Sequence, residues 1–436
     1  MFTRCLLVLS LIFVTSSASA FDLAKNVVEL RLSNGMRWLL VSRPGAPVFS
    51  GVVMLKVGSA EEVPGKTGLA HMFEHMAFKG SAELGPNEVW EVMARNGASD
   101  LNAFTAKDMT AYHASLPNNR LKLWSYVMSQ MVGSPVFRDF YTERSVVLEE
   151  LRMSVENDPD GFVMEELVQQ AFADGPYHWS TIGFKEDLEG LTDEDAAAFH
   201  HQHYVAANMV GALVGNFSLP QAKQTLEHFF GSIPAGESHA DAPPSKARGG
   251  VRKKISRDAE PLVVYAYHKP TFPDPDTYTM EAITSLLCDG VSSRLELQLI
   301  REEKIARSVS CTSNFPGLRF PNVMTIAVQP LNGISFQTIE KIVHREIEKL
   351  KIQPVADAEL ARVLSQLESH FVYSLEDNMH LAMNLASFET LFHDWKMMIS
   401  YIDHMRSITP SMIQAAAQKY LTNDRRVTIE RQRGGR

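Results

Sequence analysis

Apolar positions along this chain alternate between two periods, one typical of strands and one typical of helices. Two-residue alternation or a short apolar run predicts strands over 28–32, 37–41, 48–57, 109–116, 209–214, 262–267 and 323–328. Helical spacing predicts helices over 65–78, 141–156, 193–204, 277–287, 336–350 and 357–372. Asn34-Gly35 lies between the first two strands, so they are predicted to form a hairpin.

The pattern is interrupted once, from 234 to 250, where Pro, Ala, Gly, Ser and charged residues replace large apolar ones. This composition is typical of a linker. Strands and helices follow in a similar order on either side of it. We therefore predict two α+β domains of related build, at 21–233 and 257–436, joined by a linker at 234–256.

The first twenty residues have the features of a secretory signal peptide. One basic residue precedes an apolar run over 5–14, and Ala18-Ser19-Ala20 supplies small residues for cleavage before Phe21. The run is about half the ~20 residues that a membrane span needs, and no later stretch is long and apolar enough. The protein is expected to be exported, to the periplasm or the extracellular space, without a membrane span after cleavage. Cys288 and Cys311 could then form a disulfide or remain as buried thiols.

The composition is that of an ordinary soluble globular protein and says little more about the function. The chain has 436 residues, 45% of them hydrophobic and 21% charged, and its net charge is -9. This balance argues against nucleic acid or an anionic membrane as the main partner. Two further features are interpreted as solvated: the helix end that carries His200, His201 and His203, and the arginine-rich C-terminus from Arg425 to Arg436.

The candidate chemistry centres on His71-Met72-Phe73-Glu74-His75. Residues four apart on a helix lie on one face, so His71 and His75 can offer two imidazoles to one metal ion. Glu74 lies close enough to reach a water at that ion. The pattern is H-x-x-E-H, the inverted zincin motif, and zinc suits two neutral imidazoles and a carboxylate. Two histidines on the surface of an amphipathic helix are the alternative reading.

The carboxylate should come from the helix over 141–156. Glu143 and Glu150 are two helical turns apart and share a face, beside apolar residues that indicate a partly buried helix. A carboxylate on a buried side needs a partner, and a metal ion is a good one. Physical reasoning alone does not separate Glu149 from Glu150, and a solvated acidic face remains possible.

These residues resemble those of the pitrilysin (insulinase-like) zinc peptidases, in the short-chain branch that includes the mitochondrial processing peptidases. The segments that carry the resemblance are 68–80, Asn102-Ala103-Phe104-Thr105 with Asp108, Thr110 and Tyr112, 143–152, Pro176-Tyr177-His178, Gly183, Phe199, Tyr204, Asn208 and, in the second half, 289–295. The resemblance covers nearly the whole mature chain.

The resemblance implies a zinc-dependent endopeptidase. Zinc, one ion per chain, would be held by His71, His75 and Glu150, with Glu74 as the general base. Glu143 would orient His71 or support the ligand shell. The family fold implied is two homologous domains, each a mixed, mostly antiparallel sheet packed with helices, which form half of a clamshell around the peptide substrate. The edge strand of Asn102, Ala103, Phe104 and Thr105 would pair with the substrate backbone.

The second half departs from the family pattern. Active members carry an arginine and, seven residues on, a tyrosine, which contact substrate at the zinc site of the opposing half. Arg301 matches the arginine, but the tyrosine position falls on Ser308 or, with one residue deleted, on Arg307. A homologous subunit is therefore expected to supply the missing pair, which favours a heterodimer over a homodimer. The alternative function is a non-catalytic scaffold subunit of the same fold.

Overall fold

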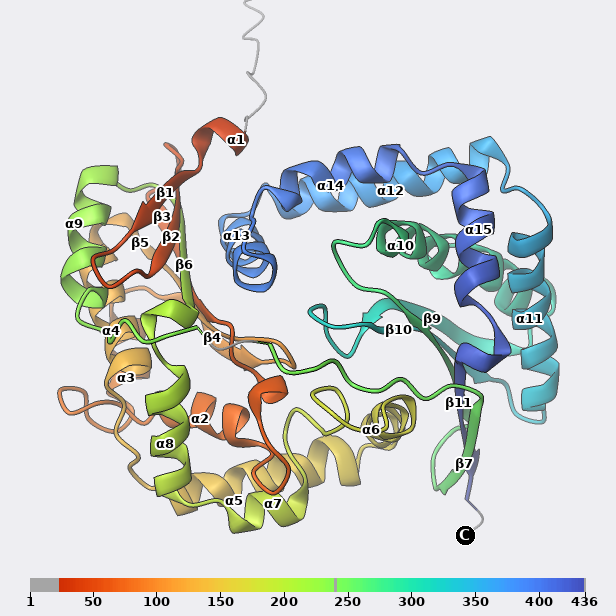
Figure 1. Ribbon diagram of the computed structural model, residues 1–436, viewed down its shortest axis with the longest axis horizontal. Helices are drawn as coiled ribbons and strands as arrows, with labels where there is room; N and C mark the ends of the chain where they lie inside the picture. The colour runs from red at the N-terminus through yellow and green to blue at the C-terminus, as the bar shows by residue number, and fades with distance from the viewer. Residues whose placement is uncertain (1–22, 239–240, 435–436) are drawn as a thin grey trace, which may run out of the picture.

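Two mixed, mainly antiparallel sheets organise the chain, one in each half (Figure 1). The computed structural model describes residues 23–238 and 241–434, so the predicted signal peptide, 1–20, lies outside it. The first sheet has the order β1-β2-β6-β3-β5-β4, formed by β1 (Val28–Arg31), β2 (Arg37–Ser42), β3 (Val48–Leu55), β4 (Ser99–Thr105), β5 (Thr110–Pro117) and β6 (Met209–Gly215).

The second sheet repeats the topology of the first. Its order is β7-β11-β8-β10-β9, formed by β7 (Val251–Arg257), β8 (Leu262–Lys269), β9 (Ala306–Phe315), β10 (Asn322–Pro330) and β11 (Arg426–Arg433). If β1 is set aside and the five remaining strands of each sheet are numbered in chain order, both sheets have the same order from one edge to the other, 1-5-2-4-3. In both, the pair formed by strands 1 and 5 is parallel and the other pairs are antiparallel. The predicted α+β fold of two domains of related build is confirmed; the boundaries given for the domains stay predictions.

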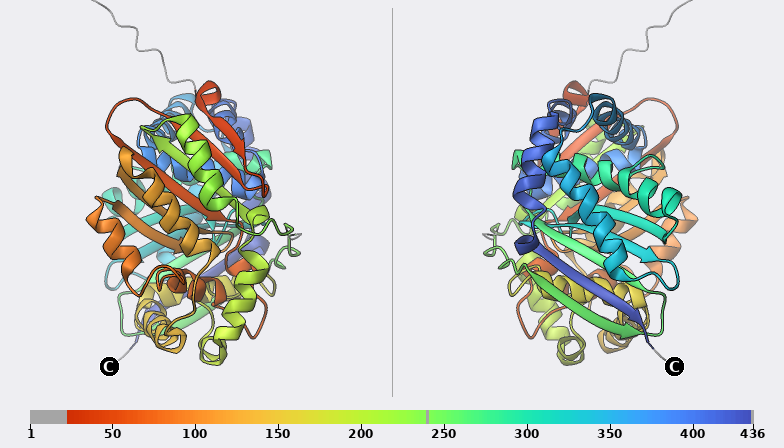
Figure 2. Two further views of the ribbon diagram at one scale, coloured as in Figure 1. Left: turned by 90° about the vertical axis from the view of Figure 1, so that its left-hand side faces the viewer. Right: turned by 90° about the vertical axis from the view of Figure 1, so that its right-hand side faces the viewer.

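Helices of each half pack mainly on the outer side of its own sheet, as the two side views show (Figure 2). The helices of the first half are α1 (Leu23–Asn26), α2 (Leu69–Ala77), α3 (Glu88–Arg95), α4 (Leu121–Gly133), α5 (Phe140–Leu151), α6 (Pro159–Ala171), α7 (Lys185–Gly190), α8 (Asp193–His203) and α9 (Leu219–Phe230). Those of the second are α10 (Pro275–Cys288), α11 (Phe336–Ile352), α12 (Asp357–Ser374), α13 (Asn378–Phe392), α14 (Met397–Arg406) and α15 (Pro410–Tyr420).

The inner face of the first sheet is covered by a helix of the second half. Along β3, Val53 faces the helices of its own half, whereas Val52 and Met54 face α13, where they meet Leu381 and Leu385. Strands buried on both faces read as continuous apolar runs, which is the pattern of β3 and β6. Figure 1 shows α13 lying against this sheet.

The second sheet is covered in the reciprocal way by α6 of the first half. Val163 and Leu167 of α6 pack with Val264 of β8 and with Val427 and Ile429 of β11. One helix of each half therefore packs on the sheet of the other half. Neither sheet would have both faces buried without this exchange.

Two interpretations from the sequence are wrong. The C-terminal arginines are not a solvated tail, because the segment from Arg426 to Arg433 forms β11, the second strand of its sheet, and the buried Arg431 is paired with Asp160. The histidines of α8 are not all solvated either. His203 is buried, and the ring of His200 stacks on Phe73.

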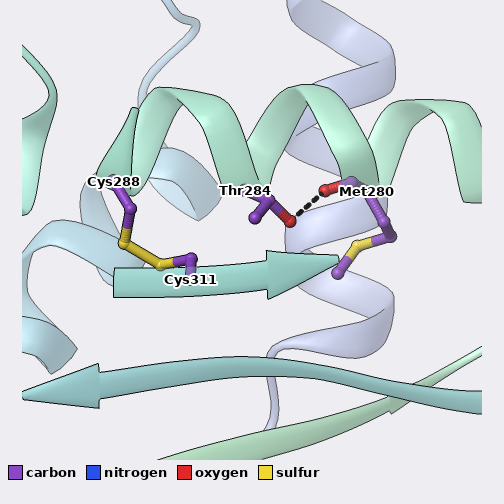
Figure 3. Close-up of a disulfide and its surroundings, with 4 residues drawn as sticks. All are labelled: Met280, Thr284, Cys288 and Cys311. Atoms are coloured by element: carbon purple, nitrogen blue, oxygen red, sulfur yellow. Dashed lines mark hydrogen bonds between the residues drawn. A yellow bond between two sulfur atoms is a disulfide. The ribbon is translucent and has the colours of Figure 1, made fainter. Parts of the chain in front are cut away.

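Cys288 and Cys311 are joined by a disulfide (Figure 3). It links the last residue of α10 to the edge strand β9, across 23 residues of sequence. The sequence left this pairing open. Within 23–238 and 241–434, no helix is both long and apolar enough to cross a bilayer.

Replacing Leu385 by Ala tests the exchange of helices. The side chain is fully buried between α13 and the first sheet, so the substitution should lower the free energy of unfolding by about 2–5 kcal/mol. Tyr373→Ala is the control, because that side chain is 67% exposed, and it should change the value by less than about 0.5 kcal/mol. Urea unfolding followed by tryptophan fluorescence measures both. Equal effects of the two substitutions would contradict the packing role of α13.

Candidate metal centre

The two histidines of H-x-x-E-H lie side by side on the partly buried face of α2. Their ring centroids are 4.8 Å apart. The opposite face of α2 carries Met72, Phe73 and Met76, which are fully buried in the core of the first half. The apolar face thus fixes the rotation of the helix, and the i, i+4 spacing turns both imidazoles toward the same point.

Glu150, on α5, completes a cluster of three ligand atoms. Its Oε1 lies 3.7 Å from His71 Nε2 and its Oε2 lies 3.4 Å from His75 Nε2. One ligand atom from each of the three residues lies within 4.8 Å of the others. Glu149 points elsewhere and accepts a hydrogen bond from Arg152 Nε at 2.8 Å. Physical reasoning from the residues leaves Glu149 and Glu150 open and the resemblance implies Glu150; the structure brings Glu150 to the histidines.

The donor set fits zinc. Burial, the largest cause, lowers the pKa of His71 to about 4, so its imidazole is neutral at pH 7 and can act as a ligand. Burial also acts to lower the pKa of His75, but the hydrogen bond with Glu150 and the nearby carboxylates together outweigh it and the pKa is raised; a metal ion at His75 would take the place of that proton. A hydrogen bond with His75 holds the pKa of Glu150 below its usual value, so it is a carboxylate. Buried His71 Nδ1 has no hydrogen-bond partner among the described residues. Two imidazoles and one carboxylate are the set found in catalytic zinc sites, with a fourth position left for water.

The side chain of Glu74, on α2, points toward β4. Its Oε2 accepts a hydrogen bond of 2.7 Å from the Thr105 hydroxyl. Burial raises the pKa of Glu74, although Thr105 and His75 oppose the shift. A buried carboxyl group with a raised pKa is suited to accept and return a proton near neutral pH.

Glu143 supports His75 rather than His71. Its Oε1 lies 3.7 Å from His75 Nδ1, on the side of the ring away from Glu150, and its other oxygen is ion-paired with Lys79. Of the two roles that the resemblance implied, orienting His71 or supporting the ligand shell, the geometry fits the second. A carboxylate at the outer nitrogen of a ligand histidine fixes the orientation of the ring.

Glu62 is a residue of the site that the sequence reasoning missed. Its carboxylate accepts hydrogen bonds of 2.8 Å from the amides of Gly68 and Ala70, at the start of α2. Complete burial raises its pKa to about 8. Gly68 has a φ of 91°, and a Cβ there would lie 2.6 Å from the carbonyl oxygen of Ile182. The one signal in the sequence that could have predicted this cap is an acidic residue, Glu62, a few positions before the start of a helix.

The substrate strand expected from the resemblance is β4, and β4 is an edge strand of the first sheet. Ala103 and Thr105 face α2, whereas Phe104 packs on the side of α13, and Asn102 is exposed. The side chain of Glu150 is 44% exposed and lies at the open surface beside the exposed Val146 and Met153. The cluster is therefore accessible from solvent beside a free strand edge.

Arg301 and Arg307 do not join this cluster within the described chain. Arg301 lies in the π-helical segment Glu296–Glu302, where its guanidinium is 3.7 Å from Glu296. Arg307 is exposed on β9, the edge strand of the second sheet.

Comparisons with known proteins place this geometry in a family. Residues 37–184 match the model described as Insulinase (Peptidase family M16), and residues 190–367 match the one described as Peptidase M16 inactive domain. The chain belongs to the M16 peptidase family. The cluster of His71, His75 and Glu150 lies wholly within the segment that matches the insulinase model.

Related M16 chains extend over nearly the same length. The chain is 26% identical over 410 residues to the zinc protease PqqE of Helicobacter pylori, covering 92% of this chain and 91% of the relative. It is 24% identical over 395 residues to the uncharacterized zinc protease YmxG of Bacillus subtilis, covering 90% and 95%.

Solved M16 structures share the fold. A protease from Helicobacter pylori superposes with a TM-score of 0.88 at 25% identity, covering 93% of this chain and 99% of the other. An M16 inactive domain from Pseudomonas fluorescens superposes with a TM-score of 0.85 at 19% identity, covering 94% and 98%. The second likeness is one of fold alone.

Removing one member of the cluster should remove the metal. Purified M16 chain is expected to contain one zinc ion, and His71→Ala or Glu150→Ala should lose it, because two remaining ligands hold zinc too weakly. Glu149→Ala is the matched control, one residue away on the same helix, and should keep the ion. Metal analysis by mass spectrometry measures all three. Stoichiometric zinc in His71→Ala or Glu150→Ala would contradict the ligand assignment.

Proposed function

We propose that this chain is a zinc-dependent endopeptidase that hydrolyses peptides or small unfolded proteins. The observation that carries the proposal is the convergence of His71, His75 and Glu150 on one point, with Glu74 beside them. The names of the M16 relatives, which are zinc proteases, support the same reading.

The chain's own residues have separate roles in this reaction. Zinc, when bound by the cluster, supplies Lewis-acid chemistry that activates water and polarises the scissile carbonyl. Glu74 accepts the proton of the attacking water on its carboxylate and returns it to the leaving amine. Glu143 keeps the ring of His75 oriented. Peptide backbone adds to the free edge of β4 as an extra strand, which brings the scissile bond to Glu74.

The catalytic assembly that we propose is a dimer in which this chain is the zinc-bearing subunit and a homologous chain closes the chamber. Neither Arg301 nor Arg307 supplies the hydroxyl of the family's tyrosine, and neither belongs to the zinc cluster. A sister chain with a complete Arg/Tyr pair would supply the missing groups. The short-chain branch of the family, export and removal of 1–20 remain part of this proposal.

A non-catalytic scaffold role is the second candidate. The match of 190–367 to a domain described as inactive favours it for the second half. The complete cluster in the first half is the feature that a scaffold would not need. Zinc-dependent turnover therefore separates the two candidates.

Glu74→Gln should abolish cleavage and leave the zinc content unchanged. An amide cannot accept the proton, so kcat should fall by at least ~10²-fold. A mixture of fluorogenic peptides measures cleavage, and metal analysis of the same sample shows that the ion is retained. Activity near that of the wild type would remove Glu74 from the role of base.

The partner is tested by assaying the purified chain with and without candidate sister chains that lack H-x-x-E-H. Cleavage should rise at least about tenfold with the correct partner, because two positioned groups are gained in the transition state. Full activity of the chain alone, unchanged in the double variant Arg301→Ala/Arg307→Ala, would exclude a required partner.

A further inference from the structure

One polar side chain of strand β4 forms a hydrogen bond with α2, the helix that carries His71, Glu74 and His75. Thr105, the last residue of the strand, points its hydroxyl at α2 and donates to Glu74 Oε2 at 2.7 Å. Ala103, two residues earlier on the same face, is buried against the apolar core. The hydroxyl is therefore placed at the side of α2 that carries the proposed base.

The turn that follows Thr105 is held by the chain after β3. The amide of Ser59 donates to the carbonyl of Ala106 at 3.1 Å, and the amide of Ala60 donates to that of Lys107 at 2.8 Å. The ammonium group of Lys107 is completely buried and donates to the carbonyl of Trp179. The backbone of Ala106 and Lys107, directly after Thr105, is thus held by hydrogen bonds to neighbouring segments of the chain.

Asp108, in the same turn, is held by donors from both halves of the molecule. This buried carboxylate accepts from the amides of Leu318 at 2.6 Å and Arg319 at 3.1 Å, and from the hydroxyl of Tyr177 at 2.8 Å. A Cβ on Gly317 would lie 2.4 Å from Asp108 Oδ2, so the approach requires glycine. Several donors from different parts of the chain fix the end of β4 before any ligand binds.

We propose that Thr105 is a positioning residue whose hydroxyl holds the carboxylate of Glu74 in line for proton transfer. The inference rests on the proposed function, and it gives Thr105 a role other than the substrate contact implied by the family resemblance. The substrate would use the free main-chain edge of β4, and the side chain of Thr105 would serve the base on the other side. One strand then links peptide binding to the orientation of Glu74.

Threonine suits this role for two physical reasons. A hydrogen bond to a charged acceptor is stronger than one between neutral groups, so the hydroxyl can restrain the carboxylate. The branched Cβ also restricts χ1, which limits the positions of the hydroxyl on a fixed backbone. Serine has the same donor without that restriction.

The kinetic test uses zinc-loaded full-length chain, with its sister chain if cleavage requires one, and the fluorogenic peptide that the wild type cuts fastest. Thr105→Val keeps the shape and removes the donor. It should lower kcat about ten- to a hundredfold, as a displaced catalytic group does, while KM stays within about twofold and zinc content is unchanged. Thr105→Ser should recover kcat to within about threefold of the wild type, because the donor returns.

Thr312→Val is the matched control, since it removes an exposed hydroxyl from the edge strand of the other sheet; it should leave kcat and KM unchanged. Three results overturn the inference: a wild-type kcat in Thr105→Val, a rise in KM alone, or no recovery in Thr105→Ser. In each case Glu74→Gln would still be inactive, so the proposed function would survive. A wild-type chain that cleaves nothing, alone or with a sister chain, would overturn both.

A second readout needs neither zinc nor turnover. In metal-free protein, Thr105→Val should lower the melting temperature when Glu74 is present, and lower it less than half as much in a Glu74→Ala background. The difference measures the coupling of the two side chains. Equal shifts in both backgrounds would show that Thr105 does not act through Glu74 and would overturn the inference.

Discussion

The reciprocal packing of α6 and α13 is the constraint on which the rest of this structure depends. Each sheet is apolar on both faces, and each half covers only one of them with its own helices. The remaining faces are buried by exchange, so the two halves form one unit. Because α6 follows the helix that carries Glu150 after a few residues, its anchorage on the second sheet also restrains the position of Glu150.

The same unit holds four acidic groups around α2, and each has its own compensation. Backbone amides compensate Glu62, the Thr105 hydroxyl compensates Glu74 and Lys79 compensates Glu143. A buried carboxyl group without such a donor would cost several kcal/mol. Glu150 differs, since its neighbours are two histidines that are themselves proposed ligands. A divalent cation at this point satisfies all three side chains together.

The sequence predicted the parts of the fold that have a strong local period. The hairpin of β1 and β2, the strands β3, β5, β6, β8 and β10, and the helices α2, α8, α10, α11 and α12 lie where the periodicity placed them. The motif on α2 was visible because both of its histidines fall on one helical face.

Other features depend on contacts that no local pattern records. The composition of β11, dominated by Arg426, Arg431 and Arg433, predicts a solvated tail, whereas Val427 and Ile429 are buried against α6. The local pattern around His200 predicts a solvated side chain, because its partner, Phe73, is more than a hundred residues away in the chain. The choice between Glu149 and Glu150 does not follow from helix periodicity, since both are on one helix; the resemblance implies Glu150, and the geometry agrees with it.

Anomalous X-ray diffraction at the zinc edge, on crystals of the purified chain, tests the central claim most directly. The account predicts one strong peak at about 2.0–2.2 Å from the nitrogen atoms of His71 and His75 and a carboxylate oxygen of Glu150. A zinc peak at other residues, or a protein that takes up no zinc at this cluster when the metal is supplied, would contradict it.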